Sequence, residues 1–198
     1  AGPSQDTGAQ PGDELFDREH LIQIEVELSA DDWALIRGEG RGLTTTLTGC
    51  EREFDYTYVS GQVTVDGQTY EDVAVRKKGF LGSLNSERPS LKVKLHHVDK
   101  EANLNGLSML TFNNNQQDVS LMSQAMGYAL YNAAGSPAPR CGYAKVIVNG
   151  KNLGIYAHVE SMKKPLLRRG FGNDRGTLYE GTVMDFFDGW DMGFERKF

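Results

Sequence analysis

Two turn dipeptides, each set between alternating apolar residues, constrain the fold of this chain most strongly. Valines alternate with polar residues on both sides of Asp66-Gly67, and branched or small apolar residues do the same around Asn149-Gly150. Both dipeptides favour a two-residue type I′ turn, because both central positions of that turn have positive φ. The sequence therefore predicts two antiparallel hairpins, the first of which spans residues 56–78.

Further segments of the chain predict four more strands and three helices. The strands are expected over residues 22–28, 91–95, 107–113 and 176–181. The helices are expected from the N-cap Ser29 to Gly38, from the cap Asp118 to Gly135, and over MKKPLLRRGF. Strands that occur in runs, with helices inserted singly, indicate an α+β fold with a mainly antiparallel sheet.

The length and charge of the chain limit its organisation and its partners. A single domain over residues 15–198 is expected, because 198 residues suit one compact unit. Residues 1–14 are small and polar and indicate a flexible leader after a cleaved signal or lipid anchor, which favours an exported protein. The net charge of −6 argues against a nucleic-acid partner held by bulk charge. No apolar run approaches the roughly 20 residues of a membrane span.

The stretch VRKKGFLGSLNSERPSLKVKL concentrates cations inside this acidic chain. Arg76 and Lys78 share one face of their strand by the period-2 rule, and Lys92 and Lys94 share one face of theirs. If the two strands pair, all four cations share a sheet face that can hold a phosphate. Backbone N–H groups for the same phosphate are offered by Gly79, Gly82 and Ser83. The alternative is a solvated face whose lysines serve solubility and protect a sheet edge.

A run of amides, residues 113–118, precedes the second predicted helix. Amide groups and the Asp118 carboxylate suit a sugar, a cation or a nucleotide, but turns and helix caps use the same side chains. We expect Asp118 to cap the helix, and the role of the asparagines stays open.

Acidic residues recur at helical spacing in the C-terminal tail. They are Asp185, Asp188, Asp191 and Glu195. Carboxylate oxygens suit Mg²⁺ or Ca²⁺, although the spacing differs from that of an EF-hand. An exposed acidic face, with the neighbouring aromatic residues packed inward, explains the pattern equally well. The four histidines show no zinc-hydrolase spacing.

The only two cysteines, Cys50 and Cys141, lie far apart beside predicted strands. A disulfide between them would close a long loop and stabilise the fold by about 4–5 kcal/mol. Two free thiols are the alternative in a reducing compartment, and the exported character of the leader favours the disulfide.

Taken in order, several of these motifs resemble the CotH family, the spore-coat-type kinases of bacteria. The resemblance runs from about Leu15 to Phe198. Its most specific parts are the R-x-K-G strand with its downstream P-x-L-K-x-K, the N-G-x-x-x-G-x-Y-x-x-x-E hairpin, and L-Y-x-G.

The resemblance implies an atypical protein kinase with a two-lobed, kinase-like fold. Such a protein binds Mg-ATP and phosphorylates Ser or Thr of secreted or coat proteins, at the cell surface or in the coat. Carried over by position, Arg76, Lys78, Lys92 and Lys94 face the nucleotide phosphates. Glu160 is then the candidate to orient one of the lysines, as the lysine-orienting glutamate does in ordinary kinases.

This chain also departs from the family pattern. Ser123 stands where family members often have Arg, and the family's catalytic and metal-binding aspartates follow the L-Y-x-G strand, in a C-terminal lobe. No matching motif is found before Phe198, so the expectation is a nucleotide-facing portion that is inactive alone, without an assignable catalytic base. The alternative is a non-catalytic exported module that binds a protein, a glycan or Ca²⁺, or serves as a structural partner.

Overall fold

The computed structural model describes residues 10–40, 55–79, 83–181 and 194–196. Seven strands form one sheet that closes into a barrel in the order β1-β2-β3-β4-β5-β7-β6. They are β1 Leu21–Glu27, β2 Val59–Val65, β3 Gln68–Lys78, β4 Ser90–Lys94, β5 Met109–Asn113, β6 Cys141–Val148 and β7 Lys151–Val159. The predicted α+β class is confirmed, and the closure of the sheet into a barrel is a feature that the sequence did not predict.

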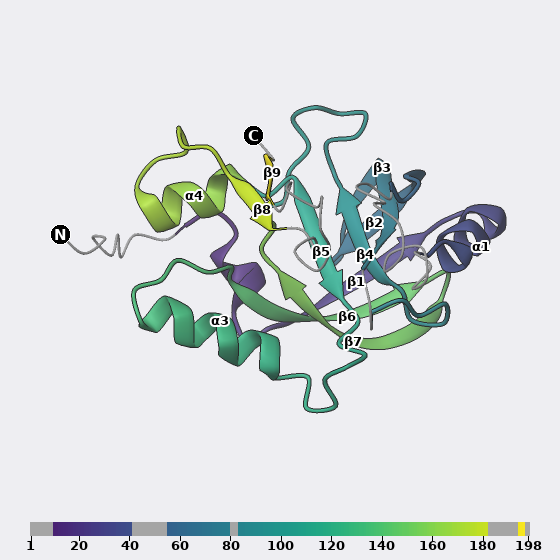
Figure 1. Cartoon of the computed structure of the whole chain (residues 1–198). Helices are drawn as coiled ribbons and strands as arrows, with labels where there is room; N and C mark the ends of the chain where they lie inside the picture. The colour runs from purple at the N-terminus through teal and green to yellow at the C-terminus, as the bar shows by residue number, and fades with distance from the viewer. Residues whose placement is uncertain (1–9, 41–54, 80–82, 182–193, 197–198) are drawn as a thin grey trace, which may run out of the picture.

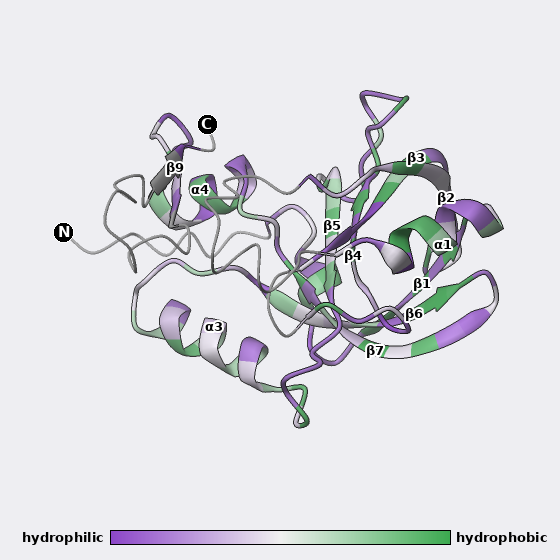
Figure 2. Cartoon of the chain, turned by 45° about the vertical axis from the view of Figure 1, so that its right-hand side comes forward, coloured by the Kyte–Doolittle hydropathy of each residue, from purple (hydrophilic) through white to green (hydrophobic). Residues whose placement is uncertain are grey.

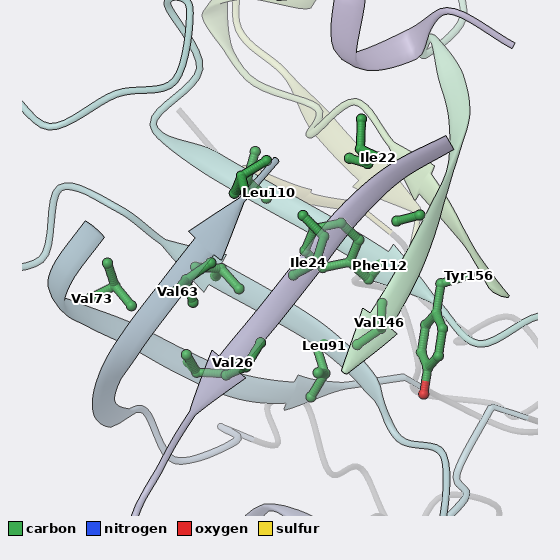
Figure 3. Packing of buried hydrophobic residues seen from close by; sticks show 14 of the residues in the cluster. Ile22, Ile24, Val26, Val63, Val73, Leu91, Leu110, Phe112, Val146 and Tyr156 are labelled. Carbon is green, nitrogen blue, oxygen red and sulfur yellow. The ribbon is translucent and has the colours of Figure 1, made fainter. Parts of the chain in front are cut away.

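Strand β1 closes the barrel, because it pairs antiparallel with β2 and parallel with β6. The other neighbouring strands pair antiparallel. Alternate residues of β1, Ile22, Ile24 and Val26, have 0% exposure and fill the interior with side chains from the facing strands (Figure 3). The barrel interior is therefore the main apolar core of the described residues.

Both predicted hairpin turns are confirmed. Asp66 and Gly67 have φ of 46° and 85°, and Asn149 and Gly150 have φ of 47° and 75°. The two turns also hold β1 in place. The Asp66 carboxylate accepts from the Gln23 N–H at 2.7 Å, and the Asn149 amide bonds to both backbone groups of Leu28.

Within the described residues, three α-helices lie outside the barrel: α1 (Ala30–Gly38), α3 (Ser123–Ala133) and α4 (Lys164–Phe171). Figure 1 shows α1 and α4 on opposite sides of it. Ser29 caps α1 as predicted, since its hydroxyl accepts from the Asp32 N–H at 3.0 Å. Helix α3 begins later than predicted, because Leu121 has φ of 59° and the helix cannot pass through a left-handed residue. Asp118 still accepts from the Ser123 N–H at 2.7 Å, at the start of the helix.

Helix α3 runs along one side of the barrel (Figure 2). Ala125 and the half-buried Tyr128 of this helix pack against the barrel, whereas Met122, Met126 and Leu130 are exposed. Small side chains face α3 on the outer surface of β6 and β7, namely Cys141, Ala157 and Val159.

The two ends of the described chain add short elements. A 3₁₀ helix, η1 (Asp13–Phe16), begins within the predicted leader and buries Leu15 and Phe16, the first residues of the predicted domain. Strand β8 (Tyr179–Gly181), predicted from GTLYEG, pairs antiparallel with β9 (Phe194–Arg196). The tail residues 194–196 are therefore extended rather than helical.

Candidate functional site

The pairing of β3 with β4 brings the predicted cations together. Arg76 lies directly opposite Lys92, while Lys78 lies opposite Ser90 and Lys94 opposite Ala74. Because directly opposite residues of an antiparallel pair point to the same side, all four cations share the outer face of the barrel wall. The alternating Val75 and Val93 point inward, into the core.

Lys78 is the most strongly perturbed member of this cluster. Its side chain is half-buried and its Nζ donates to the Asn113 Oδ1 at the end of β5. Burial, together with the positive charges of Lys92 and Arg76, lowers the pKa of Lys78 from 10.5 to about 8, and the Glu180 carboxylate on β8 partly offsets this shift. The ammonium form of Lys78 is thus less favourable here than in water, and a bound anion would stabilise it.

Arg76 is held by aromatic rings from the segment before β2. Its guanidinium carbon lies 5.2 Å from the Tyr58 ring centroid and 5.8 Å from that of Tyr56. The Arg76 Nε is buried and has no hydrogen-bond partner among the described residues. Stacking therefore fixes the position of the guanidinium and leaves a donor for a ligand.

Gly79 begins the loop that joins β3 to β4. Its φ is 137°, and a Cβ on it would lie 2.4 Å from the Ser83 Oγ, so glycine is required there. The Tyr56 hydroxyl donates to the Gly79 carbonyl at 2.9 Å. Gly79 and Ser83 thus lie together beside Lys78, while Gly82, the third predicted source of a backbone N–H, lies outside the described residues.

Glu160 has different partners from those predicted. Its carboxylate, 2% exposed, accepts from Nη2 of Arg140 and Nη2 of Arg169, both at 2.7 Å, and from the Arg140 backbone N–H at 3.0 Å. Arg140 also pairs with Asp13. The described partners of Glu160 are thus arginines, and its role in orienting a lysine stays a prediction. Glu160, which follows β7, thus links β7 to the start of β6 and to α4. The described carboxylate that interacts with Lys78 is instead that of Glu180.

Comparison of the sequence with known proteins identifies its family. The model of the family described as CotH kinase protein matches residues 75–197, which is more than half of the chain. The chain belongs to the CotH family. The match begins within β3 and contains the four cations, Glu160 and Glu180.

One relative of this CotH chain is the inner spore coat protein H-like protein of Bacillus subtilis (strain 168). The two are 29% identical over 104 residues, which cover 52% of this chain and 34% of the relative. The matched part therefore spans about a third of the relative's length.

His158 is a buried polar residue of the CotH chain whose setting the sequence did not indicate. It has 0% exposure and stacks between Phe16 and Phe112, with ring centroids 4.6 Å and 5.1 Å away. Its Nδ1 lies 3.1 Å from the Leu15 carbonyl, which can only accept, so Nδ1 carries the proton. Burial lowers the pKa of His158 to about 4, which keeps the ring neutral and structural.

The remaining predicted site residues of the CotH chain lie elsewhere. Cys141 is a free, buried thiol, whose pKa burial raises to about 11, and Cys50 lies outside the described residues, so the disulfide is not confirmed. The acidic residues Asp185, Asp188 and Asp191 also lie outside them. Within the described ranges, no three His, Cys, Asp or Glu side chains gather to hold a metal ion, and no helix is long and apolar enough to cross a membrane.

Proposed function

We propose that this CotH chain supplies the phosphate-binding wall of an ATP site, with Arg76, Lys78 and Lys92 as the contacts. The single observation that carries the proposal is the crowding of three cations on one sheet face around the partly desolvated Lys78. Oxygen atoms of a polyphosphate would accept charge-assisted hydrogen bonds from all three side chains. Lys94, opposite Ala74, extends the same face by one strand position.

The energetics of this cluster favour a binding role over a solvated face. Like charges placed directly across a strand pair destabilise each other, and burial makes the charged form of Lys78 more unfavourable still. A phosphate group would add negative charge to that of Glu180, which only partly offsets the causes that lower the pKa of Lys78. Lysines used only for solubility would be fully exposed, whereas the cluster is half-buried.

The reaction that we propose for the complete site is phosphoryl transfer from Mg-ATP to a Ser or Thr hydroxyl of a coat or exported protein. The acceptor oxygen bonds to the γ-phosphorus, the bond to the β-phosphate oxygen breaks, and a base takes the hydroxyl proton. The described residues contribute phosphate binding, and Asp185, Asp188 and Asp191 are candidate Mg²⁺ ligands. The spore-coat name of the B. subtilis relative supports a location in a coat.

A non-catalytic protein-binding module is the second candidate. The observation that favours it is the exposed apolar side of α3, where Met122, Met126 and Leu130 are 50%, 59% and 70% exposed. Met-rich surfaces adapt to varied partners. In this alternative the chain turns over no ATP, and the cations serve only as a charged surface.

Titration calorimetry of Mg-ATP into the wild type and Lys92→Met tests the first candidate. Methionine keeps an unbranched apolar stem and removes the charge, so the affinity should fall about tenfold or more, as for one lost hydrogen bond to a charged group. Lys145→Met is the matched control, because β6 neighbours neither β3 nor β4. Equal affinities of the wild type and Lys92→Met would overturn the proposal.

A further inference from the structure

The amide run after β5 lines a second polar pocket, which the proposed function does not use. Its volume is about 300 Å³, and the loop before β4 forms the opposite wall. The polar side chains that line it come from Asn85, Arg88, Asn114, Asn115, Gln116 and Asp118.

Asn114 joins the two walls of this pocket. Its side chain, 1% exposed, donates to the Arg88 carbonyl at 2.7 Å and to the Ser83 carbonyl at 3.1 Å, and it accepts from the Gln116 N–H at 3.2 Å. The Asn85 Oδ1 accepts from the Arg88 N–H at 2.8 Å within the loop. The pocket is thus held open by hydrogen bonds that are already complete, and Asn114 has no amide atom left for a ligand.

Arg88 is fixed in one orientation in the pocket wall. Its Nη2 donates to the Ile155 carbonyl at 2.9 Å, and its guanidinium carbon lies 5.2 Å from the Tyr156 ring centroid. The Arg88 Nε and the Asn115 Nδ2 are buried donors that have no acceptor among the described residues. Arg88 and Asn115 therefore each have an N–H donor that a small movement of the side chain would direct to a ligand.

The acidic side chain of the pocket is already satisfied. The Asp118 carboxylate accepts from the Ser120 hydroxyl and N–H and from the Ser123 N–H, and these bonds lower its pKa. It is therefore a poor ligand for a cation. The polar groups of the pocket that remain unpaired are N–H donors, and Arg88 adds a positive charge.

We propose that this pocket binds a carboxylate group, through the Arg88 guanidinium and the Asn115 amide. A planar carboxylate matches the fork of one guanidinium and balances its single charge. A dianionic phosphate fits less well, because one cation faces it and the Asp118 carboxylate lies in the same wall. The pocket thus differs in ligand class from the cluster around Lys78.

Residue-resolved NMR with sodium acetate as the probe tests the proposal. In the ¹⁵N-labelled protein, acetate should shift the Arg88 Nε–H and Asn115 NH₂ signals to saturation, relative to sodium chloride at equal ionic strength. Asn115→Gly keeps the left-handed backbone, φ 50°, and removes the donor, so the acetate affinity should fall about tenfold. Asp72→Gly, at an exposed residue with the same φ of 50°, should bind acetate as the wild type does.

Three outcomes would overturn the carboxylate site. They are an absence of saturable shifts with acetate, tighter binding of inorganic phosphate than of acetate at these two signals, and an unchanged acetate affinity in Asn115→Gly. The tripeptide Gly-Glu-Gly, acetylated at its N-terminus and amidated at its C-terminus so that the Glu side chain is its only carboxylate, distinguishes the sources of the carboxylate. Competition with acetate assigns the site to acidic side chains of peptides, and lack of competition assigns it to small free acids. Because Arg76 and Lys78 give separate signals, failure here leaves the ATP proposal standing, and the reverse also holds.

Discussion

Lys78 is placed where its charge opposes folding. Its pKa is about 8 in the folded chain, below the ordinary value of 10.5, so between these values the unfolded chain binds more protons. Stability therefore rises with pH through this window, and the full penalty of the charged lysine is present below pH 8. A residue whose charge lowers the stability of the fold is typical of a functional site.

Replacing Lys78 by Met should stabilise the free protein. We expect the free energy of unfolding to rise by about 1–3 kcal/mol at pH 7, since an apolar side chain replaces a partly desolvated cation. The gain should shrink as the pH rises from 8 to 10.5. Urea unfolding of the wild type and the variant at several pH values measures both effects, and a destabilised variant at pH 7 would contradict them.

His158 should make the fold sensitive to acid. Its folded pKa is about 4 and its ordinary value is 6.5, so the unfolded chain binds the extra proton between these values. Stability should accordingly fall as the pH drops from 6.5 to 4, by at most about 1.4 kcal/mol per pH unit from this residue. His158→Phe keeps the stacking on Phe16 and Phe112. In this variant the free energy of unfolding should depend less steeply on pH between 4 and 6.5, by the contribution of His158. An unchanged slope in urea unfolding would refute the assignment.

For single residues, the sequence predicted a shared face but missed several partners. Alternation along a strand is a local property, so the cations of β3 and those of β4 could each be assigned to one face from the sequence alone. The arginine partners of Glu160 could not be assigned in this way. Arg169 reaches it from α4 and Arg140 from the start of β6, and only tertiary packing brings these side chains together.

Among the elements, α4 and η1 are attached to the barrel by the Glu160 cluster. Both carboxylate oxygens accept from guanidinium groups, and the side chains of Arg140 and Arg169 are only 14% and 19% exposed. Removing the central charge would take from the largely buried Arg169 its Glu160 counter-ion and leave Arg140 with the Asp13 carboxylate. The position of α4 therefore depends on this carboxylate.

Glu160→Gln should destabilise the fold by about 3–5 kcal/mol, because it breaks a buried ionic network on one side. Its Mg-ATP affinity, measured below the unfolding temperature, should match that of the wild type if Glu160 has no lysine to orient. Glu87→Gln is the matched control, since Glu87 also pairs with two cations, Arg37 and Lys151, but is 61% exposed. A much smaller loss of stability is expected there. A large loss of ATP affinity in Glu160→Gln would restore the predicted lysine-orienting role.

Local chemistry explains which elements the sequence could predict. Asp66-Gly67 and Asn149-Gly150 specify their hairpins within a few residues, and Ser29 specifies the start of α1. The start of α3 was predicted too early because Leu121 adopts a left-handed backbone conformation, which is rare for leucine. No sequence pattern predicts that conformation.

In the molecule as a whole, closure of the barrel sets the geometry of the site. The parallel pairing of β1 with β6 joins strands far apart in the sequence, and no turn motif encodes it. Sequence alternation therefore predicted the α+β class but not the closed sheet. The interior is filled by apolar side chains, and Arg76, Lys78, Lys92 and Lys94 face outward. The remaining lysine of β3, Lys77, lies on the other face, is buried, and donates to the Arg37 carbonyl at 3.1 Å.

If the crowded cations bind phosphate, then ATP should change the protonation of Lys78, and the proton balance of binding measures this change. Calorimetry in two buffers of different ionisation enthalpy counts the protons taken up. At pH 6.5 Lys78 is already charged, so uptake by this residue should be near zero. At pH 8.5, where its pKa of about 8 leaves it mostly neutral and the ATP phosphates are ionised, binding should take up a proton. Lys78→Met should lose this uptake. Binding heats that do not depend on the buffer at pH 8.5 would contradict the proposed phosphate site.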